Sequence, residues 1–140
     1  STQNQQDGAG TIQSGLIARS EFVREHPEIV QTFVNTVLQS AYWVSQAQNR
    51  NSAIQLVTQN AGLPNKLYEL SLKNKTFSTV YSPLLDGYFI EHLQQGVKTA
   101  LNAKLIKRHV DVKQWQNPEF LNRGLQQLNY TTVWTAQPSK

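Results

Sequence analysis

The residues of this sequence that could carry out chemistry are few and scattered. Three histidines, His26, His92 and His109, lie in separate segments without the four-residue spacing of a metal pair on one helix. Glu91 is adjacent to His92, and neighbouring residues point to different sides of a helix. The chain has no Cys, which excludes a thiolate nucleophile, a disulfide framework and a cysteine zinc site. We expect neither a metal site nor a cofactor.

Nucleophilic catalysis also lacks a recognisable framework here. A serine nucleophile needs a strained turn such as Gly-x-Ser-x-Gly and a base beside it, and Gln13-Ser14-Gly15 echoes that pattern only superficially. Gly8-Ala9-Gly10 lacks the further glycine and the helix of a phosphate-binding loop. The sequence therefore predicts a protein that is not an enzyme.

One pair of residues is a candidate for contact with a small ligand. Tyr81 closes a segment predicted to be extended, and Ser82-Pro83 directly after it predicts a helix start. A helix N-terminus beside a hydroxyl group is suited to an anion. Capping of the helix alone would also explain Ser82, so both interpretations of the pair stay open.

Composition limits the classes of partner. The 140 residues carry a formal charge of +4, and the basic side chains cluster only from Lys104 to Lys113. That cluster is typical of a solvated helix C-terminus, where cations offset the dipole. A footprint for nucleic acid or for acidic lipid is the alternative interpretation, ranked well below it, and we expect no nucleic-acid binding. The chain lacks Met, which predicts that it is processed or cut from a longer one, and it has no apolar run of the roughly 20 residues that a spanning helix needs.

The pattern along the chain predicts a mainly helical fold with one or two isolated strands. Residues 1–10 are polar and glycine-containing and are expected to be a flexible arm or crossover linker; residues 11–130 form the folded part, and 131–140 a tail. Thr11 to Ala18 is predicted to be a strand, and Thr76 to Tyr81 a second extended segment. An isolated strand needs a partner from a second copy or from a missing N-terminal half.

Helices account for most of the remaining periodicity. Ser20 predicts the N-cap of a short helix that ends before Pro27, and Pro27 begins a long helix to about Gln48. We expect one buried stripe along it, formed by Val30, Phe33, Val34, Val37, Leu38, Ala41 and Val44. Further helices are predicted from Asn51 or Ser52 up to Gly62, from Pro64, from Ser82-Pro83 to about Ala103, and from Pro118 to Leu128, with a short turn around 111–115.

The order of these signals resembles a known family. The matching segments are Asp7 to Gly10, Leu16 to Phe22, Glu25 to Val30, Ala41 to Val44, Tyr81 to Leu84, Leu105-Ile106 and Val110 to Val112. Together they are similar to the aliphatic-sulfonate, taurine and nitrate-type solute-binding proteins of ABC importers, which include thiamine-precursor binders. The resemblance covers residues 7–129, and Lys107 stands where the family commonly has proline.

The resemblance implies that the chain is the C-terminal portion of a two-lobed α/β periplasmic-binding-protein fold of type II. It implies an extracytoplasmic protein, periplasmic after removal of a signal peptide or anchored to the membrane as a lipoprotein. Such a protein captures a small, sulfonate-like anionic solute between its lobes and delivers it to an ABC permease. Gly8, Gly10 and Gly15, near the return strand, are candidate hinge residues.

Two other functions remain open at this point. The first is a stand-alone helical interaction module, a dimer in which the isolated strand pairs with its twin. The second is an enzyme of thiamine-precursor biosynthesis with a fold related to the binders. The absence of Cys and the scattered histidines place this second alternative last.

Overall fold

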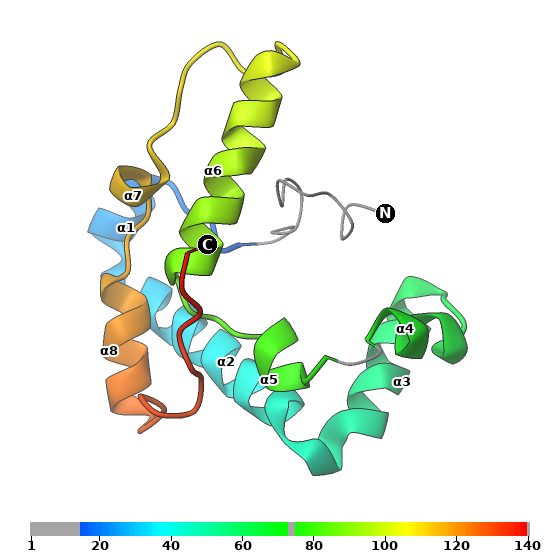
Figure 1. Ribbon diagram of the computed structural model, residues 1–140. Coiled ribbons are helices and arrows are strands. Elements are labelled where there is room, and N and C mark those ends of the chain that lie inside the picture. Colours follow the sequence, from blue (N-terminus) through cyan, green and yellow to red (C-terminus); the bar gives the residue numbers. More distant parts are fainter. Residues whose placement is uncertain (1–14, 73–74, 140) are drawn as a thin grey trace.

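The computed structural model describes residues 15–72 and 75–139, and within them the regular structure is helical, with no strand. The helices are α1 (Ser20–Glu25), α2 (Pro27–Ser45), the short 3₁₀ turn η2 (Ala47–Asn49), α3 (Arg50–Ala61), α4 (Asn65–Ser71), α5 (Phe77–Val80), α6 (Gly87–Asn102), α7 (Val112–Trp115) and α8 (Glu119–Gln127). Figure 1 shows α2 as the long central element, with α8 beside it and α3 and α4 beyond its C-terminal end.

Proline sets the boundary between the first two helices. Pro27 is in the first turn of α2, as predicted, because its missing N–H costs no helical hydrogen bond there. The prediction that Ser20 caps α1 is wrong, since the N-cap is Arg19, in an extended conformation and without a side-chain hydrogen bond. α2 ends at Ser45, a few residues before the predicted Gln48.

The main core lies between α2, α8 and the chain after α8. Leu38 of α2 is 1% exposed and packs with Leu125 of α8 and with Trp134. Gln31 of α2 also donates through Nε2 to the Phe120 carbonyl oxygen of α8 at 2.9 Å. The last residues, for which the sequence predicted no element, thus include a central core residue in Trp134.

The prediction of a single buried stripe on α2 is wrong for two of its residues. Phe33 and Val37 are exposed, with 55% of the Phe33 surface accessible, and Ile29 one turn earlier is exposed as well. The physical reason is that α8 and Trp134 cover only the side of α2 that carries Leu38. Apolar periodicity identifies an amphipathic helix but does not say which of its apolar positions find a partner.

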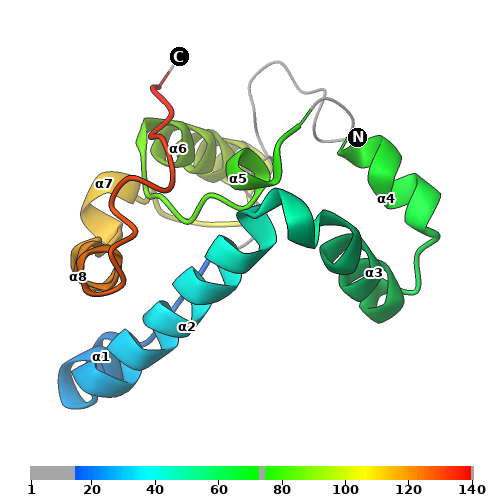
Figure 2. The ribbon, with the colours of Figure 1, turned by 90° about the horizontal axis from the view of Figure 1, so that it is seen from below.

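A second, smaller core lies where α3, α4 and α5 meet. It contains Ala53 and Ile54 of α3, Leu72 after α4 and Phe77 of α5. Gly62 ends α3 in the left-handed conformation, with φ of 62°, and the Leu63 N–H donates to the Thr58 carbonyl oxygen at 3.0 Å. The predicted C-terminal glycine is therefore confirmed. In Figure 2, α3 and α4 lie next to each other as a helical hairpin.

Two sequence predictions of extended structure are wrong within the described residues. Residues 77–80 form α5, because Thr76 caps the helix, its Oγ1 accepting from the Thr79 N–H at 3.3 Å, and Phe77 is buried. Residues 15–18 form no strand, since no neighbouring strand satisfies their backbone groups, and Leu16 and Ile17 are exposed. Thr11 to Ser14 lie outside the described residues. The motivation for a strand-swapped dimer is thereby weakened.

The start of α6 also differs from the prediction. The helix begins at Gly87 and not at Pro83, because Asp86 is its N-cap and accepts from the Phe89 N–H at 3.0 Å. The other Asp86 carboxylate oxygen accepts from the Gln137 N–H at 2.7 Å. One carboxylate thus both begins α6 and holds the C-terminal segment against it.

None of the described helices has the combination of length and apolar content that a membrane span requires.

The packing of α8 on α2 predicts that a methyl group added at Gly124 of α8 destabilises the protein, whereas one added at Gly96 of α6 does not. A Cβ atom at Gly124 would lie 2.7 Å from Leu38 Cδ1 and 2.6 Å from Asn35 Oδ1, and Leu38 is too deeply buried to move aside. We expect Gly124→Ala to lower the free energy of unfolding by about 1–3 kcal/mol.

The control is Gly96→Ala in α6, where an added Cβ meets no described heavy atom within 4 Å. This variant should gain roughly 0.5–1 kcal/mol from helix propensity. Urea denaturation followed by circular dichroism measures both. A Gly124→Ala protein as stable as Gly96→Ala would show that α8 does not pack on α2 as described.

Candidate functional site

Tyr81 lies at the centre of a small aromatic and polar cluster. It follows α5 directly and is half-buried, and its hydroxyl group contacts the hydroxyl group of Tyr68 from α4. Its ring packs edge-on against Phe77, with the ring centroids 5.5 Å apart. The candidate residue from the sequence therefore lies where α4 and α5 meet.

Ser82 is next to this cluster but does not begin a helix. Its Oγ accepts from the Leu84 N–H at 3.4 Å, within the irregular segment before Asp86. Because α6 begins at Gly87, the predicted anion site at a helix N-terminus beside Tyr81 is not formed. Any contact of Ser82 with a ligand has to be made by the hydroxyl group itself.

Arg50 is a residue of this cluster that the sequence reasoning missed. It is the first residue of α3 and half-buried, and its guanidinium carbon lies 4.5 Å from the centroid of the Phe77 ring. No carboxylate pairs with it within residues 15–72 and 75–139. Arg50 stands just before the predicted helix start at Asn51, and this position was the available sign of a functional residue. Only the fold brings Arg50 to Phe77.

We call Arg50, Tyr68, Phe77 and Tyr81 the Arg50 cluster. Its four side chains come from α3, α4, α5 and the residue that follows α5. Burial, and secondarily the contact with Tyr68, raises the pKa of the Tyr81 hydroxyl group well above its usual value near 10. Tyr81 is therefore a neutral hydrogen-bond donor over the whole physiological pH range. A guanidinium group and neutral hydroxyl groups are donors suited to an oxyanion.

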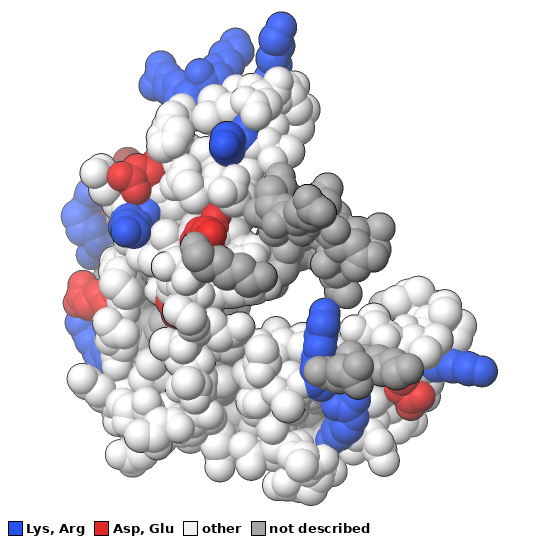
Figure 3. All heavy atoms as spheres, in the orientation of Figure 1, with Lys and Arg blue, Asp and Glu red and all other residues white. Residues whose placement is uncertain are grey.

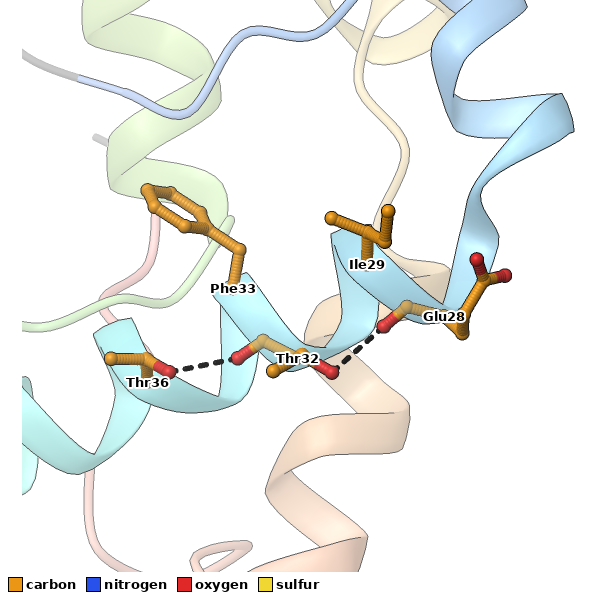
Figure 4. A pocket seen from close by; sticks show the side chains of 5 residues that line it. All are labelled: Glu28, Ile29, Thr32, Phe33 and Thr36. Carbon is orange, nitrogen blue, oxygen red and sulfur yellow. Dashed lines mark hydrogen bonds between the residues drawn. The ribbon is translucent and has the colours of Figure 1, made fainter.

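A hollow lies away from the Arg50 cluster, on the side of α2 that α8 leaves open. Figure 4 shows Ile29 and Phe33 side by side above the helix, with Glu28, Thr32 and Thr36 along the same face. The two threonine hydroxyl groups donate back to the carbonyl oxygens of Glu28 and Thr32, each at 2.9 Å. Among the described residues, the lining comes from one helix alone, which gives no group facing a solute from an opposite side.

The other candidate residues lie apart from the Arg50 cluster. Among residues that the structure describes, no group of three or more potential ligands could hold a metal. His26 lies by Phe22, His92 Nδ1 is 2.8 Å from the Tyr88 carbonyl oxygen, and His109 is near Gln94. Gly15 lies in the irregular segment before α1, with open space around it, while Gly8 and Gly10 are outside the described residues.

The raised pKa of Tyr81 makes a prediction for alkaline pH. Because the folded-state value lies above the value near 10 of an unfolded tyrosine, folding favours the protonated hydroxyl group. Its contribution to stability is present below about pH 10 and is lost as the pH rises further. We expect Tyr81→Phe to flatten this alkaline loss of stability and to remove a late phase from the tyrosinate absorbance titration.

Tyr42→Phe, at a ring stacked on Tyr130, is the control and should keep that late phase. If Tyr81→Phe loses amplitude from the early phase of the titration and keeps the whole late phase, the burial of Tyr81 is contradicted.

The comparisons with known proteins agree with this fold. No family model and no curated protein matches the chain. Among solved structures, a periplasmic sulfonate-binding protein of a sulfonate ABC transporter, SsuA from Methylobacillus flagellatus KT, has 29% sequence identity and a TM-score of 0.78. The match covers 88% of this chain, which spans 38% of that protein. The resemblance predicted from the motifs is thus confirmed: in sequence and backbone, the chain is similar to part of an ABC-transporter periplasmic solute-binding protein.

Proposed function

We propose that this chain is part of the extracytoplasmic solute-binding component of an ABC importer. The observation that carries the proposal is the match to a sulfonate-binding protein over 88% of the chain with a TM-score of 0.78. The order of the sequence motifs also supports it, because those motifs resemble the same class of protein. No bond is broken in this function, which agrees with the absence of a nucleophile and base framework from the sequence.

We further propose that the solute is a small organic anion of the sulfonate type and that the Arg50 cluster supplies part of its site. A guanidinium group presents its donors in a planar fork that matches two oxygens of an oxyanion. The guanidinium group of Arg50 lies over the Phe77 ring, and the Tyr81 ring packs edge-on against the same ring. The hydroxyl group of Tyr81 contacts that of Tyr68, and Ser82 follows Tyr81 in the chain. The chain spans 38% of the protein it matches, so the remaining contacts would come from a part of the protein beyond these residues.

Delivery to a permease would depend on closure of two lobes around the solute. A solute that binds the closed form better shifts the population towards it, and the closed form would be the one that the permease recognises. The proposed hinge is Gly8, Gly10 and Gly15, because these glycines precede the first described helix in the sequence.

The first test is the intact mass of the native polypeptide, followed by calorimetric titration of that polypeptide with ethanesulfonate. The neutral molecule ethyl methyl sulfone, of similar shape, is the control ligand. We expect a mass roughly twice that of 140 residues and binding of the sulfonate alone. A native mass equal to that of this chain, with no binding of ethanesulfonate, taurine or nitrate, would overturn the transport proposal.

The contribution of the Arg50 cluster is tested in the same titration. Arg50→Gln should weaken sulfonate binding roughly 10- to 100-fold, since it removes charge-assisted hydrogen bonds. Lys113→Gln removes the same charge from an exposed position on α7 and should leave the affinity unchanged. Equal affinities of Arg50→Gln and wild type would remove the cluster from the site and leave the transport function standing.

The hinge is tested by fixing the backbone at Gly15 in the native polypeptide. Gly15→Pro restricts φ and should slow or weaken sulfonate binding while the protein still folds. Gly15→Ala is the control, because the structure leaves open space around an added Cβ and φ is not in the left-handed region. Unchanged affinity and closure kinetics in Gly15→Pro would remove this hinge.

A further inference from the structure

The end of α6 carries a concentration of positive charge. Lys104, Lys107 and Arg108 follow the helix within a few residues, and all three side chains are exposed and have no carboxylate partner among the described residues. Figure 3 shows Lys and Arg side chains gathered over the end of the molecule at which α6 terminates. We call residues 104–109 the basic tip.

The backbone of the basic tip is fixed by the way in which α6 ends. Lys104 adopts the left-handed conformation with φ of 58°, and its N–H donates to the Leu101 carbonyl oxygen at 2.9 Å. The Leu105 N–H donates to the Ala100 carbonyl oxygen, also at 2.9 Å. This pair of bonds is a Schellman motif, in which the residue at the Leu105 position usually packs back on the helix. Here Leu105 is 79% exposed and extends into solvent.

The chain that returns from the tip is also held in place. Gln94 of α6 donates to the Val110 carbonyl oxygen at 3.0 Å and accepts from the Val112 N–H at 3.1 Å. Val112 is 1% exposed. Asp111 is the acidic residue nearest in sequence. One of its carboxylate oxygens accepts from the backbone N–H groups of Lys113 and Gln114 at the start of α7. The basic tip is thus a loop with a backbone fixed by hydrogen bonds, and it carries three cations around the exposed Leu105.

We propose that the basic tip binds the surface of an anionic phospholipid bilayer. The Lys and Arg side chains match the phosphate groups of the lipid, and Leu105 stands at the position from which a side chain reaches the boundary between headgroups and acyl chains. Compensation of the helix dipole explains the cations at the C-terminus of α6 but not the exposed leucine among them. A convex loop suits the deformable surface of a bilayer better than a rigid protein groove. This inference does not depend on the proposed solute.

Vesicle co-sedimentation of the native polypeptide tests the proposal. The vesicles are phosphatidylcholine with about one third phosphatidylglycerol, and pure phosphatidylcholine vesicles are the neutral control. We expect binding to the anionic vesicles alone, weakened by salt. Replacing Lys104, Lys107 and Arg108 by Gln should lower the partition coefficient roughly 100-fold. Leu105→Ser should lower it roughly tenfold while keeping the charge.

The matched control replaces three exposed cations elsewhere, Arg19, Arg24 and Lys66, by Gln, which removes the same net charge. This variant should keep most of the binding. Equal losses in the two triple variants, or no binding of wild type to anionic vesicles, would overturn the proposal. An effect of the tip variant on transport without any vesicle binding would also overturn it, because the partner of the tip would then be a protein.

Discussion

The packing of α8 and Trp134 against α2 is the interaction on which the rest of the structure depends. Leu38 is buried between elements that are separated by most of the chain, and Trp134 donates through its indole N–H to Ser45 Oγ at 3.3 Å. Tyr42 stacks on Tyr130 in the same region, with ring centroids 4.5 Å apart. Burial of this apolar surface is what holds the two ends of the described chain together. The positions of α6 and of the C-terminal segment follow from it through Asp86.

The candidate site depends on the second core in a similar way. Phe77 is buried against α3 and α4, and this places its ring under the guanidinium group of Arg50 and beside Tyr81. A cation held over an aromatic ring keeps its hydrogen-bond donors available at its edge. The small helix α5 therefore brings Phe77 and Tyr81 to Arg50 and Tyr68 of the earlier helices, and the four residues form one potential oxyanion site.

The exposed apolar side chains of α2 agree with the proposal that this chain is part of a larger protein. Ile29, Phe33 and Val37 are four residues apart, so they share one face of the helix, and all three are exposed. Exposed apolar side chains grouped in this way are typical of an interface. The chain spans 38% of the sulfonate-binding protein that it matches. Under the proposed function, the remainder of the protein would cover this face and complete the solute site.

The sequence by itself determined the helical class, the family resemblance and several helix boundaries. Pro27 acts through its fixed φ and missing N–H, and Gly62 acts through its freedom to adopt a positive φ, so both effects belong to the residue itself. Thr76 and Asp86 show the limit of this reasoning, since each starts a helix by accepting a backbone hydrogen bond. The β-propensity of residues 76–81 predicted an extended segment instead of α5, and Ser82-Pro83 predicted an earlier start for α6. Several capping residues compete locally, and packing of Phe77 and of the C-terminal segment selects among them.

Periodicity could not separate exposed Phe33 from buried Leu38, and no local pattern brought Arg50 to Phe77. Only the tertiary structure decided these points, because they depend on which distant elements meet.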